Sequence, residues 1–125
     1  MFTNTKAFSS FSVNDLAKAK EFYGEKLGLK ISETPEGLDI DIAGAYNIFV
    51  YPKKNHTPAT FTILNFPVSN IDEAVDRLTS MGIRFEQYEG EMQTDKKGIF
   101  RGHPGPKIAW FKDPAGNYLS VLEAK

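Results

Sequence analysis

The amino-acid sequence predicts an α+β fold built from two tandem βαβββ modules, whose curved mixed sheets surround a cleft. Three observations lead to this prediction. Residues 7–13 and residues 62–68 share one strand-like apolar pattern. Each run is followed by a helical pattern, which ends at Gly28 in the first copy and at Gly82 in the second. Short strand-like runs then follow each glycine. Because the same elements recur in the same order, we interpret the chain as two diverged copies of one unit.

We expect the copies to form a single domain over residues 1–125, since this length is typical of one domain. Module 1 is predicted at about residues 1–52 and module 2 at about residues 60–125, from the positions of the repeated patterns. The polar, proline-bearing segment 53–59 is predicted to be the linker between them.

The helix of each module is predicted from apolar side chains that recur at helical spacing. These are Leu16, Ala19, Tyr23 and Leu27 in module 1, and Ile71, Ala74, Val75, Leu78 and Met81 in module 2. Asn14 and Ser69 are predicted to cap the free amides at the two helix starts. Gly28 and Gly82 fit the left-handed position that commonly follows a helix end.

The remaining strands are predicted from short apolar or alternating runs between turn residues. In module 1 they are residues 29–34, 37–42 and 46–51, and in module 2 residues 83–88, 107–112 and 118–123. The segment 113–117, Asp-Pro-Ala-Gly-Asn, is predicted to be a tight turn. The segment 90–106 is expected to be a loop or an irregular strand.

Alternation along the first strand of each module separates its side chains into two faces. The more apolar sets are predicted to cover the helices: Ala7, Ser9, Phe11 and Val13, and Thr62, Leu64, Phe66 and Val68. The opposite sets are Phe8, Ser10 and Ser12, and Ile63, Asn65 and Pro67. Such a mixed face suits a concave ligand surface. An ordinary half-exposed sheet or a dimer contact is the alternative.

Composition excludes several function classes. The net charge of −1 argues against a dedicated nucleic-acid-binding protein, which is usually basic, and gives no sign of attraction to membranes. The chain has no cysteine, so disulfides, thiolate catalysis and cysteine-based zinc sites are excluded. Without a signal-peptide pattern or a membrane-spanning run, a cytoplasmic protein is expected.

Four segments carry a resemblance to a known family. Residues 11–16 read Phe-Ser-Val-Asn-Asp-Leu, and Phe-Tyr follows at 22–23 and Leu-Gly-Leu at 27–29. Residues 110–117 read Trp-Phe-Lys-Asp-Pro-Ala-Gly-Asn. With the duplication, they resemble the vicinal oxygen chelate superfamily of glyoxalases, bleomycin-resistance proteins and extradiol dioxygenases. The resemblance covers essentially the whole chain and implies that each module rolls its strands around a cleft.

Metal-dependent members of this superfamily hold a divalent ion with His, Glu or Gln side chains on the first and last strands of the modules. By the resemblance, the first-strand positions fall on Phe8 and Ile63, one last-strand position falls on Ser120, and the fourth lies near Phe49. Phenylalanine and isoleucine cannot bind a cation, and a serine hydroxyl is a poor ligand. The sequence therefore predicts no metal and no cofactor.

The predicted ligand-binding side chains lie on the faces opposite the helices. They are Phe8, Ser10, Phe49, Tyr51, Ile63, Asn65, Trp110, Tyr118 and Ser120. Trp110 offers a flat stacking wall, with core packing as its alternative role. No residue is assigned a catalytic role. His103, with Arg101 and Lys107 near it, could serve as an acid–base group or anion clamp, although a solvated loop histidine is the favoured interpretation.

The sequence thus favours a small-molecule-binding protein, which sequesters or senses a small, partly aromatic compound. The resemblance implies a homodimer, and the net charge of −1 gives no reason to expect a nucleic-acid or membrane partner. One alternative is a metal-dependent lyase, isomerase or dioxygenase whose ligands lie at other positions. Another is an interaction module whose cleft is filled by its own rings.

Overall fold

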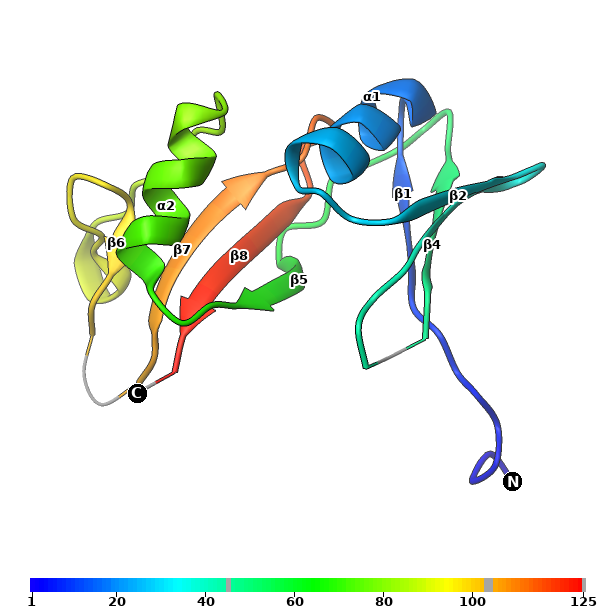
Figure 1. The fold of residues 1–125 in the computed structure, drawn as a ribbon, viewed down its shortest axis with the longest axis horizontal. Coiled ribbons are helices and arrows are strands. Elements are labelled where there is room, and N and C mark those ends of the chain that lie inside the picture. The colour runs from blue at the N-terminus through cyan, green and yellow to red at the C-terminus, as the bar shows by residue number, and fades with distance from the viewer. Residues whose placement is uncertain (45, 103–104, 125) are drawn as a thin grey trace. The chain divides into compact units, whose positions relative to one another are not determined.

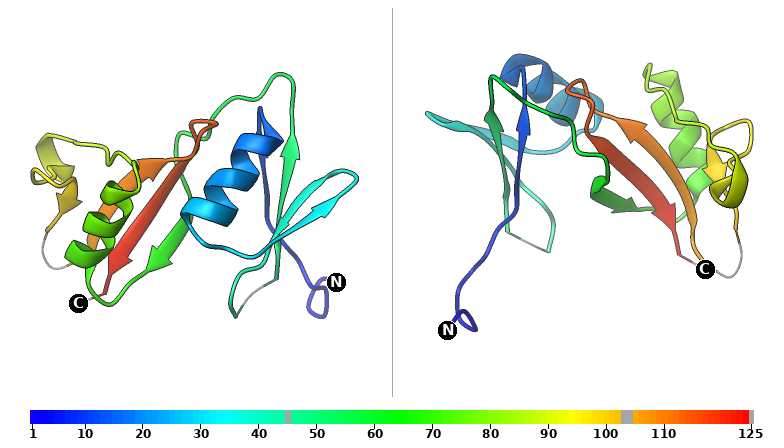
Figure 2. Two further views of the ribbon diagram at one scale, coloured as in Figure 1. Left: turned by 45° about the horizontal axis from the view of Figure 1, so that its top comes forward. Right: turned by 180° about the vertical axis from the view of Figure 1, so that it is seen from behind.

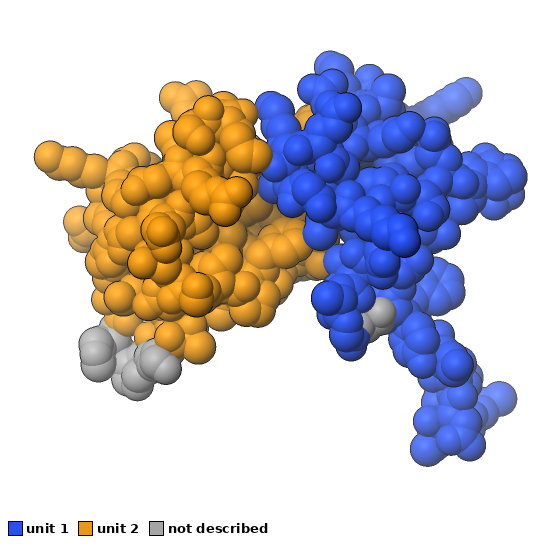
Figure 3. All heavy atoms as spheres, in the orientation of Figure 1, with its two compact units in different colours: residues 1–58 blue, residues 59–125 orange. Residues whose placement is uncertain are grey.

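The computed structural model of the chain describes residues 1–44, 46–102 and 105–124. It divides into two compact units, Met1–Pro58 and Ala59–Lys125, which Figure 3 colours separately. We call them module 1 and module 2. Their boundary falls at the end of the predicted linker. The cleft and the single domain expected from the sequence stay predictions.

Module 1 is a four-stranded mixed sheet with one helix (Figure 1). Its elements are β1 (Ser10–Val13), α1 (Leu16–Lys20), the π-helical turn η1 (Glu21–Lys26), β2 (Ile31–Thr34), β3 (Gly37–Ile40) and β4 (Ile48–Pro52). The strand order is β1-β4-β3-β2. β1 runs parallel to β4, and the other neighbours are antiparallel.

Module 2 repeats this arrangement. Its elements are β5 (Thr62–Pro67), α2 (Ile71–Ser80), the 3₁₀ turn η2 (Gly90–Met92), β6 (Ile99–Phe100), β7 (Lys107–Lys112) and β8 (Tyr118–Glu123). The strand order is β5-β8-β7-β6, with β5 parallel to β8. Figure 2 shows α2 lying across β7 and β8. The α+β fold of two tandem βαβββ modules is therefore confirmed.

Both helices begin one residue later than predicted. The side chain of Asp15, not Asn14, accepts the backbone N–H of Lys18 at 3.2 Å. Likewise Asn70, not Ser69, accepts the N–H of Glu73 at 3.1 Å. Each pair offers two good capping residues, and the cap is the one whose extended backbone immediately precedes the first helical turn. The left-handed conformation predicted for Gly28 and Gly82 is confirmed, with φ of 73° and 89°.

The first helix is not a regular α-helix throughout. After Lys20 it widens into η1, where the N–H of Leu27 bonds the carbonyl of Phe22, five residues earlier, at 2.9 Å. Phe22 and Tyr23 are consecutive, yet both are buried. Their rings meet edge to face with centroids 5.2 Å apart, and Tyr23 also packs on Phe11 at 5.7 Å. This ring cluster forms the centre of the module 1 core.

The strand predicted at residues 83–88 is wrong. Within this segment Phe85 makes an isolated bridge to Phe111, and the N–H of Glu86 bonds the carbonyl of Trp110 at 2.8 Å. The reason is that β6, inside the predicted 90–106 loop, pairs with the first half of β7. Only the second half of β7 is then left to pair with the segment 83–88.

The helix-facing sides of both sheets are buried. Val13, Ile40 and Val50 are at most 1% exposed in module 1, and Phe111 and Leu119 are fully buried in module 2. Phe11 lies on the helix side, as predicted, because its ring contacts Tyr23. In the described part of the chain, neither helix has the length or the apolar composition required to cross a bilayer.

Candidate ligand-binding site

A hollow of about 410 Å³ opens on module 2 at the sheet face opposite α2. Its lining residues are Thr60, Thr62, Tyr88, Met92, Trp110 and Tyr118. We call it the ring-lined cavity. Its volume lies within the range of small-molecule pockets, which are mostly apolar with a few well-placed polar groups.

Strand alternation places the two largest walls of this cavity. On β7, Ala109 and Phe111 are fully buried on the helix side, so Trp110 between them points to the other face. On β8, Leu119 is buried on the helix side, and Tyr118 before it points to the cavity. The structure therefore favours the cavity-wall interpretation of Trp110 over core packing.

Further rings hold the indole of Trp110. The ring of Tyr88 meets it edge-on, with centroids 5.6 Å apart and an interplanar angle of 76°. The ring of Phe100 lies 6.4 Å away on a tilt. The ammonium of Lys112 stands 5.1 Å from the centre of the Tyr118 ring. The contacts with Tyr88 and Phe100 fix the indole as a flat surface on which a planar ligand can stack.

A β-bulge in β5 re-aims the first residue of that strand. Thr62 pairs with Tyr118, whereas Leu64 pairs with the next residue along, Leu119, so Ile63 is an extra residue between the two pairs. Because of this shift Thr62 shares the face of Tyr118 and lines the cavity. The prediction that Thr62 faces the helix is therefore wrong, although Leu64 does lie opposite the buried Leu119.

A part-buried hydrogen bond lies on the same face of the sheet. The hydroxyl of Ser120, which is fully buried, donates to Oδ1 of Asn65 at 2.5 Å. The two residues are paired across β5 and β8. The structure thus brings four of the predicted site residues together on this face: Asn65, Trp110, Tyr118 and Ser120. Ile63 lies in the bulge and is half-buried.

The cavity offers neutral hydrogen-bonding groups. Burial, followed by the nearby Tyr118 and the charge of Glu86, raises the pKa of Tyr88 to about 12. Its phenol therefore stays protonated at physiological pH and can donate a hydrogen bond. None of the described residues that line the cavity carries a carboxylate. Rings, hydroxyls and a thioether suit an uncharged, partly aromatic ligand.

The other predicted site residues belong to module 1. Ser10 pairs with Phe49, and the rings of Phe49 and Tyr51 stack at 6.0 Å with an angle of 18°. They lie on the sheet face opposite α1. Phe8 precedes β1 and is 66% exposed. On that same face the hydroxyl of Ser12 lies 2.7 Å from Nδ1 of His56, a contact that the sequence did not predict.

Four lining residues of the ring-lined cavity were not predicted as site residues: Thr60, Thr62, Tyr88 and Met92. Thr60 precedes the predicted strand, and the bulge hides Thr62 from the alternation pattern. Tyr88 lies in a segment that was predicted as a regular strand. Met92 lies in a segment predicted only as a loop. Their uncharged side chains and their positions beside β5 and β7 are too common in the sequence to identify them as site residues.

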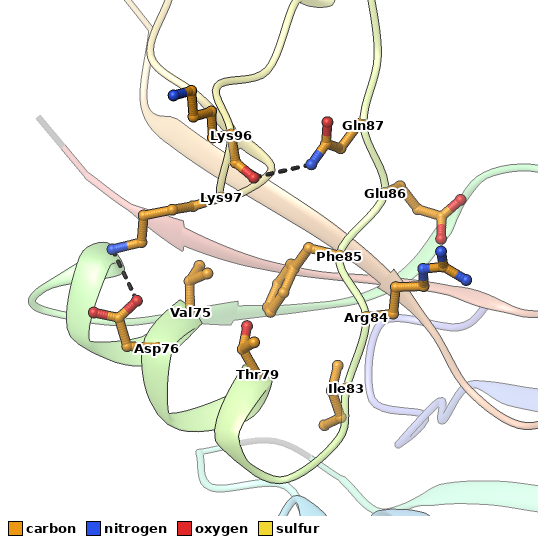
Figure 4. Close-up of a pocket in the computed structure, with 10 residues that line it drawn as sticks. All are labelled: Val75, Asp76, Thr79, Ile83, Arg84, Phe85, Glu86, Gln87, Lys96 and Lys97. Atoms are coloured by element: carbon orange, nitrogen blue, oxygen red, sulfur yellow. Dashed lines mark hydrogen bonds and ion pairs between the residues drawn. The ribbon is translucent and has the colours of Figure 1, made fainter.

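A larger hollow of about 780 Å³ lies on the helix side of module 2 (Figure 4). Residues of α2, the segment 83–87 and the segment 96–97 surround it. Its apolar floor, Val75, Ile83 and Phe85, is at most 9% exposed, so a ligand entering it would cover little additional apolar surface. Despite its smaller volume, the ring-lined cavity is therefore the stronger candidate for ligand binding.

Sequence similarity over most of the chain determines its family. The family model described as the Glyoxalase/Bleomycin resistance protein/Dioxygenase superfamily matches residues 8–121. This chain belongs to that superfamily. The resemblance based on the sequence segments is thereby confirmed. Among curated proteins no significant match is found.

Several solved structures share this fold. TnmS3, an antibiotic binding protein from Streptomyces sp. CB03234, is 22% identical over 98% of this chain and 99% of its own, with a TM-score of 0.70. The fosfomycin resistance protein FosX from Listeria monocytogenes is 15% identical over 95% and 92%, with a TM-score of 0.71. Lactoylglutathione lyase from Agrobacterium tumefaciens is 19% identical over 97% and 95%, with a TM-score of 0.68.

The strand register relates Phe49, near which the resemblance puts the fourth metal-ligand position, to a residue of module 2. Phe49 lies opposite Ser10 as Ser120 lies opposite Asn65, so Phe49 is the module 1 counterpart of Ser120. In residues 1–44, 46–102 and 105–124, no three histidine or carboxylate side chains are placed to hold a metal ion. The side chains at the four positions do not fit a divalent ion. His103, considered as an acid–base group, lies outside the described residues.

Proposed function

We propose that this superfamily member binds a small, partly aromatic molecule in the ring-lined cavity of module 2, without a resident metal ion, and thereby sequesters or senses it. The observation that carries the proposal is the position of Trp110. Its indole stands on the open face of the sheet, held by Tyr88 and Phe100 beside a hollow of about 410 Å³. Such a flat apolar wall with neutral hydroxyls nearby suits a planar ligand.

Superfamily membership supports the proposal in general terms. One structural neighbour is an antibiotic binding protein, and another is a fosfomycin resistance protein. A third is a lactoylglutathione lyase. The fold therefore serves proteins that bind small molecules and proteins that act on them. The chemistry of the cavity in this chain favours binding, since its described lining consists of rings, hydroxyls and a thioether.

The protein provides its own reporter for a binding test, because Trp110 is its single tryptophan. Purified protein is titrated with a panel of uncharged planar aromatics while Trp110 fluorescence is recorded, with N-acetyltryptophanamide as the control for inner-filter effects. Saturable quenching, with a matching rise in Tm, is the expected result. If no member of the panel quenches Trp110 or raises Tm at millimolar concentration, the binding function is contradicted.

The absence of a resident metal has a separate test. After dialysis, elemental analysis of the purified protein should find less than about 0.1 divalent ion per chain, because no suitable ligand set is formed by Phe8, Phe49, Ile63 and Ser120. One tightly held ion per chain would instead favour the alternative, a metal-dependent lyase, isomerase or dioxygenase. The double variant F8H/S120E should still bind zinc weakly, since Ile63 supplies no ligand and the supporting groups are missing.

The homodimer, the cytoplasmic location and the single domain stay predictions. Light scattering at several protein concentrations measures the oligomeric state, and fractionation of the producing cells measures the location.

A further inference from the structure

One wall of the ring-lined cavity is the side chain of Met92, which belongs to the segment 92–101. Ion pairs attach this segment to α2. Met92 of this segment lines the cavity, and Phe100 packs its ring on Trp110. We propose that Asp72 and Arg101 are positioning residues of the ligand site, because their ion pair holds this wall against Trp110. The inference rests on the proposed function for its meaning, but the position of the wall can be tested without a ligand.

Five charged side chains form the attachment, which we call the ion-pair latch. They are Asp72 and Asp76 of α2, and Asp95, Lys97 and Arg101 of the segment. Arg101 donates from Nη2 to Asp72 at 2.7 Å and from Nε to Asp95 at 2.9 Å. Lys97 lies 3.0 Å from Asp72 and 2.9 Å from Asp76. Asp72 therefore links both cations to the helix.

The latch and the ring of Phe100, which packs on Trp110, occupy opposite faces of one small hairpin. Thr94 and Phe100 bridge each other in antiparallel fashion. Neighbouring residues of a strand point to opposite sides. Phe100 points to Trp110 and the next residue, Arg101, points to α2. Asp95, which follows Thr94, points to Arg101. Arg101 of the latch is thus the neighbour of Phe100 in the chain, so a shift of Arg101 also moves Phe100.

A second link connects the hairpin to Tyr88. The hydroxyl oxygen of Thr94 accepts the backbone N–H of Tyr88 at 2.9 Å, and the N–H of Thr94 bonds the carbonyl of Tyr88 at 3.0 Å. Tyr88 in turn packs edge-on against Trp110. Movement of the hairpin would therefore disturb both rings that hold the indole, Phe100 directly and Tyr88 through Thr94.

The latch connects α2 to the hairpin across a hollow. The larger hollow of about 780 Å³ separates α2 from the segment 96–97, and the ion pair of Asp76 with Lys97 spans it (Figure 4). The amide of Gln87 donates to the carbonyl of Lys96 at 2.9 Å across the same region. These connections are polar and partly exposed, so salt can weaken them.

The centre of the hairpin is also anchored by contacts outside the latch. Ile99 is fully buried and pairs with Ala109 of β7. The backbone of Gly98 packs so closely on Phe85 that an added Cβ would lie 2.7 Å from the Cβ of Phe85. Loss of the latch should therefore loosen the wall while the fold of module 2 is retained.

The ligand-free test is acrylamide quenching of Trp110 in the full chain. In Arg101→Gln and in Asp72→Asn the quenching constant should rise about two-fold, since exposed ion-pair networks confer modest local order. The double variant should fall short of the sum of the two single effects, because both changes break the Asp72–Arg101 ion pair. The control is Lys20→Gln, which removes an exposed ion pair with Glu33 at 2.8 Å in module 1 and should leave quenching unchanged.

Sodium chloride supplies a second measurement on the unaltered protein. Raising the salt from about 0.02 M to 1 M shortens the Debye length from roughly 20 Å to 3 Å and should increase quenching toward the Arg101→Gln value. In Arg101→Gln the salt effect should be smaller. Equal quenching in wild type, Arg101→Gln and Asp72→Asn, with no response to salt, would overturn the inference.

The ligand arm uses the uncharged fluorophore N-phenyl-1-naphthylamine, so that salt and charge act on the protein alone. Its affinity should fall about three-fold in Arg101→Gln and stay unchanged in Lys20→Gln, as expected for the loss of one positioning contact. If the wild type binds no planar aromatic, the proposed function is contradicted. The quenching experiment alone then tests whether the latch positions the hairpin. Unchanged affinity in Arg101→Gln, where the wild type binds, contradicts the inference.

Discussion

Module 1 and module 2 place different side chains at the same register positions of their sheets. The three central positions on the face opposite the helix hold Ser10, Phe49 and Asp39 in module 1, and Asn65, Ser120 and Trp110 in module 2. The helix-facing positions, by contrast, are apolar in both modules. The buried face therefore maintains the same fold in both modules, whereas the open face determines which chemical groups each module presents.

The exchange of a large ring with a small side chain accounts for the difference in shape. In module 1 the rings of Phe49 and Tyr51 stack on each other and occupy their face. In module 2 the counterpart of Phe49 is Ser120, whose small hydroxyl is satisfied by Asn65. The large ring is instead Trp110, one strand further, where it forms a wall beside open space.

The largest expected effect tests whether the two frames are equivalent. Ile40 and Phe111 occupy matching core positions, opposite Ile48 and Leu119, and both are fully buried. Ile40→Ala should lower the free energy of unfolding by about 2–5 kcal/mol and Phe111→Ala by about 3–5 kcal/mol, because each leaves a cavity. Urea unfolding measures both. A loss below about 1 kcal/mol for either would show that its module is not held by this core.

The next prediction concerns the turn 113–117 of module 2. The buried carboxylate of Asp113 accepts the N–H of Ala115 at 2.9 Å and that of Asn117 at 2.8 Å. Asp113→Ala leaves these buried donors without that acceptor and should cost about 1–3 kcal/mol in urea unfolding. Asp41→Ala, at an exposed side chain in module 1, is the control and should change stability by less than about 0.5 kcal/mol.

A third prediction sharpens the contrast between the open faces. Trp110→Ala should weaken binding of an uncharged planar aromatic about 10–100-fold, because it removes the stacking wall of the cavity. The matched variant is Asp39→Ala, at the same register position of module 1, and it should bind the ligand as the wild type does. Calorimetric titration measures both. Equal losses in the two variants would break the assignment of the site to module 2.

The smallest effect is on acid stability. Hydrogen bonds from Arg101 and Lys97 lower the pKa of Asp72 from 3.8 to about 2. A group whose pKa is lowered by folding stabilises the protein above its unfolded pKa and loses that contribution as pH falls through the folded value. Between pH 4 and pH 2, Asp72→Asn should therefore lose stability less steeply than the wild type, as measured by urea unfolding. Parallel curves would contradict this.

Much of the frame could be predicted from the sequence. The repeat of strand, helix and glycine was visible because apolar periodicity follows the buried face, and β7 and β8 were predicted with the observed bounds. Trp110 and Tyr118 are site residues in the sequence-based prediction, although alternation along residues 107–112 leaves open whether the face of Trp110 lines a cleft or packs in the core. Such patterns are local and strong, so they survive without knowledge of the tertiary contacts.

Features set by tertiary pairing were missed. Whether residues 83–88 form a strand depends on which segment reaches the edge of β7 first, and β6 does so. The π-helical turn depends on how Phe22 and Tyr23 both reach the core. The contribution of Thr62 to the cavity depends on a bulge that leaves no mark in the alternation. The ion-pair latch joins residues far apart in the chain, so composition alone could not find it.

The bulge at Ile63 has a consequence for how such proteins diverge. It lies on an edge strand, where one extra residue opposes no partner. Gain or loss of a single codon at this point would rotate Thr62 and the residues before it to the opposite face, while Leu64 and all that follows keep their register. One insertion or deletion can thus change which side chains line the edge of a binding cavity in a single evolutionary step, while the core stays unchanged.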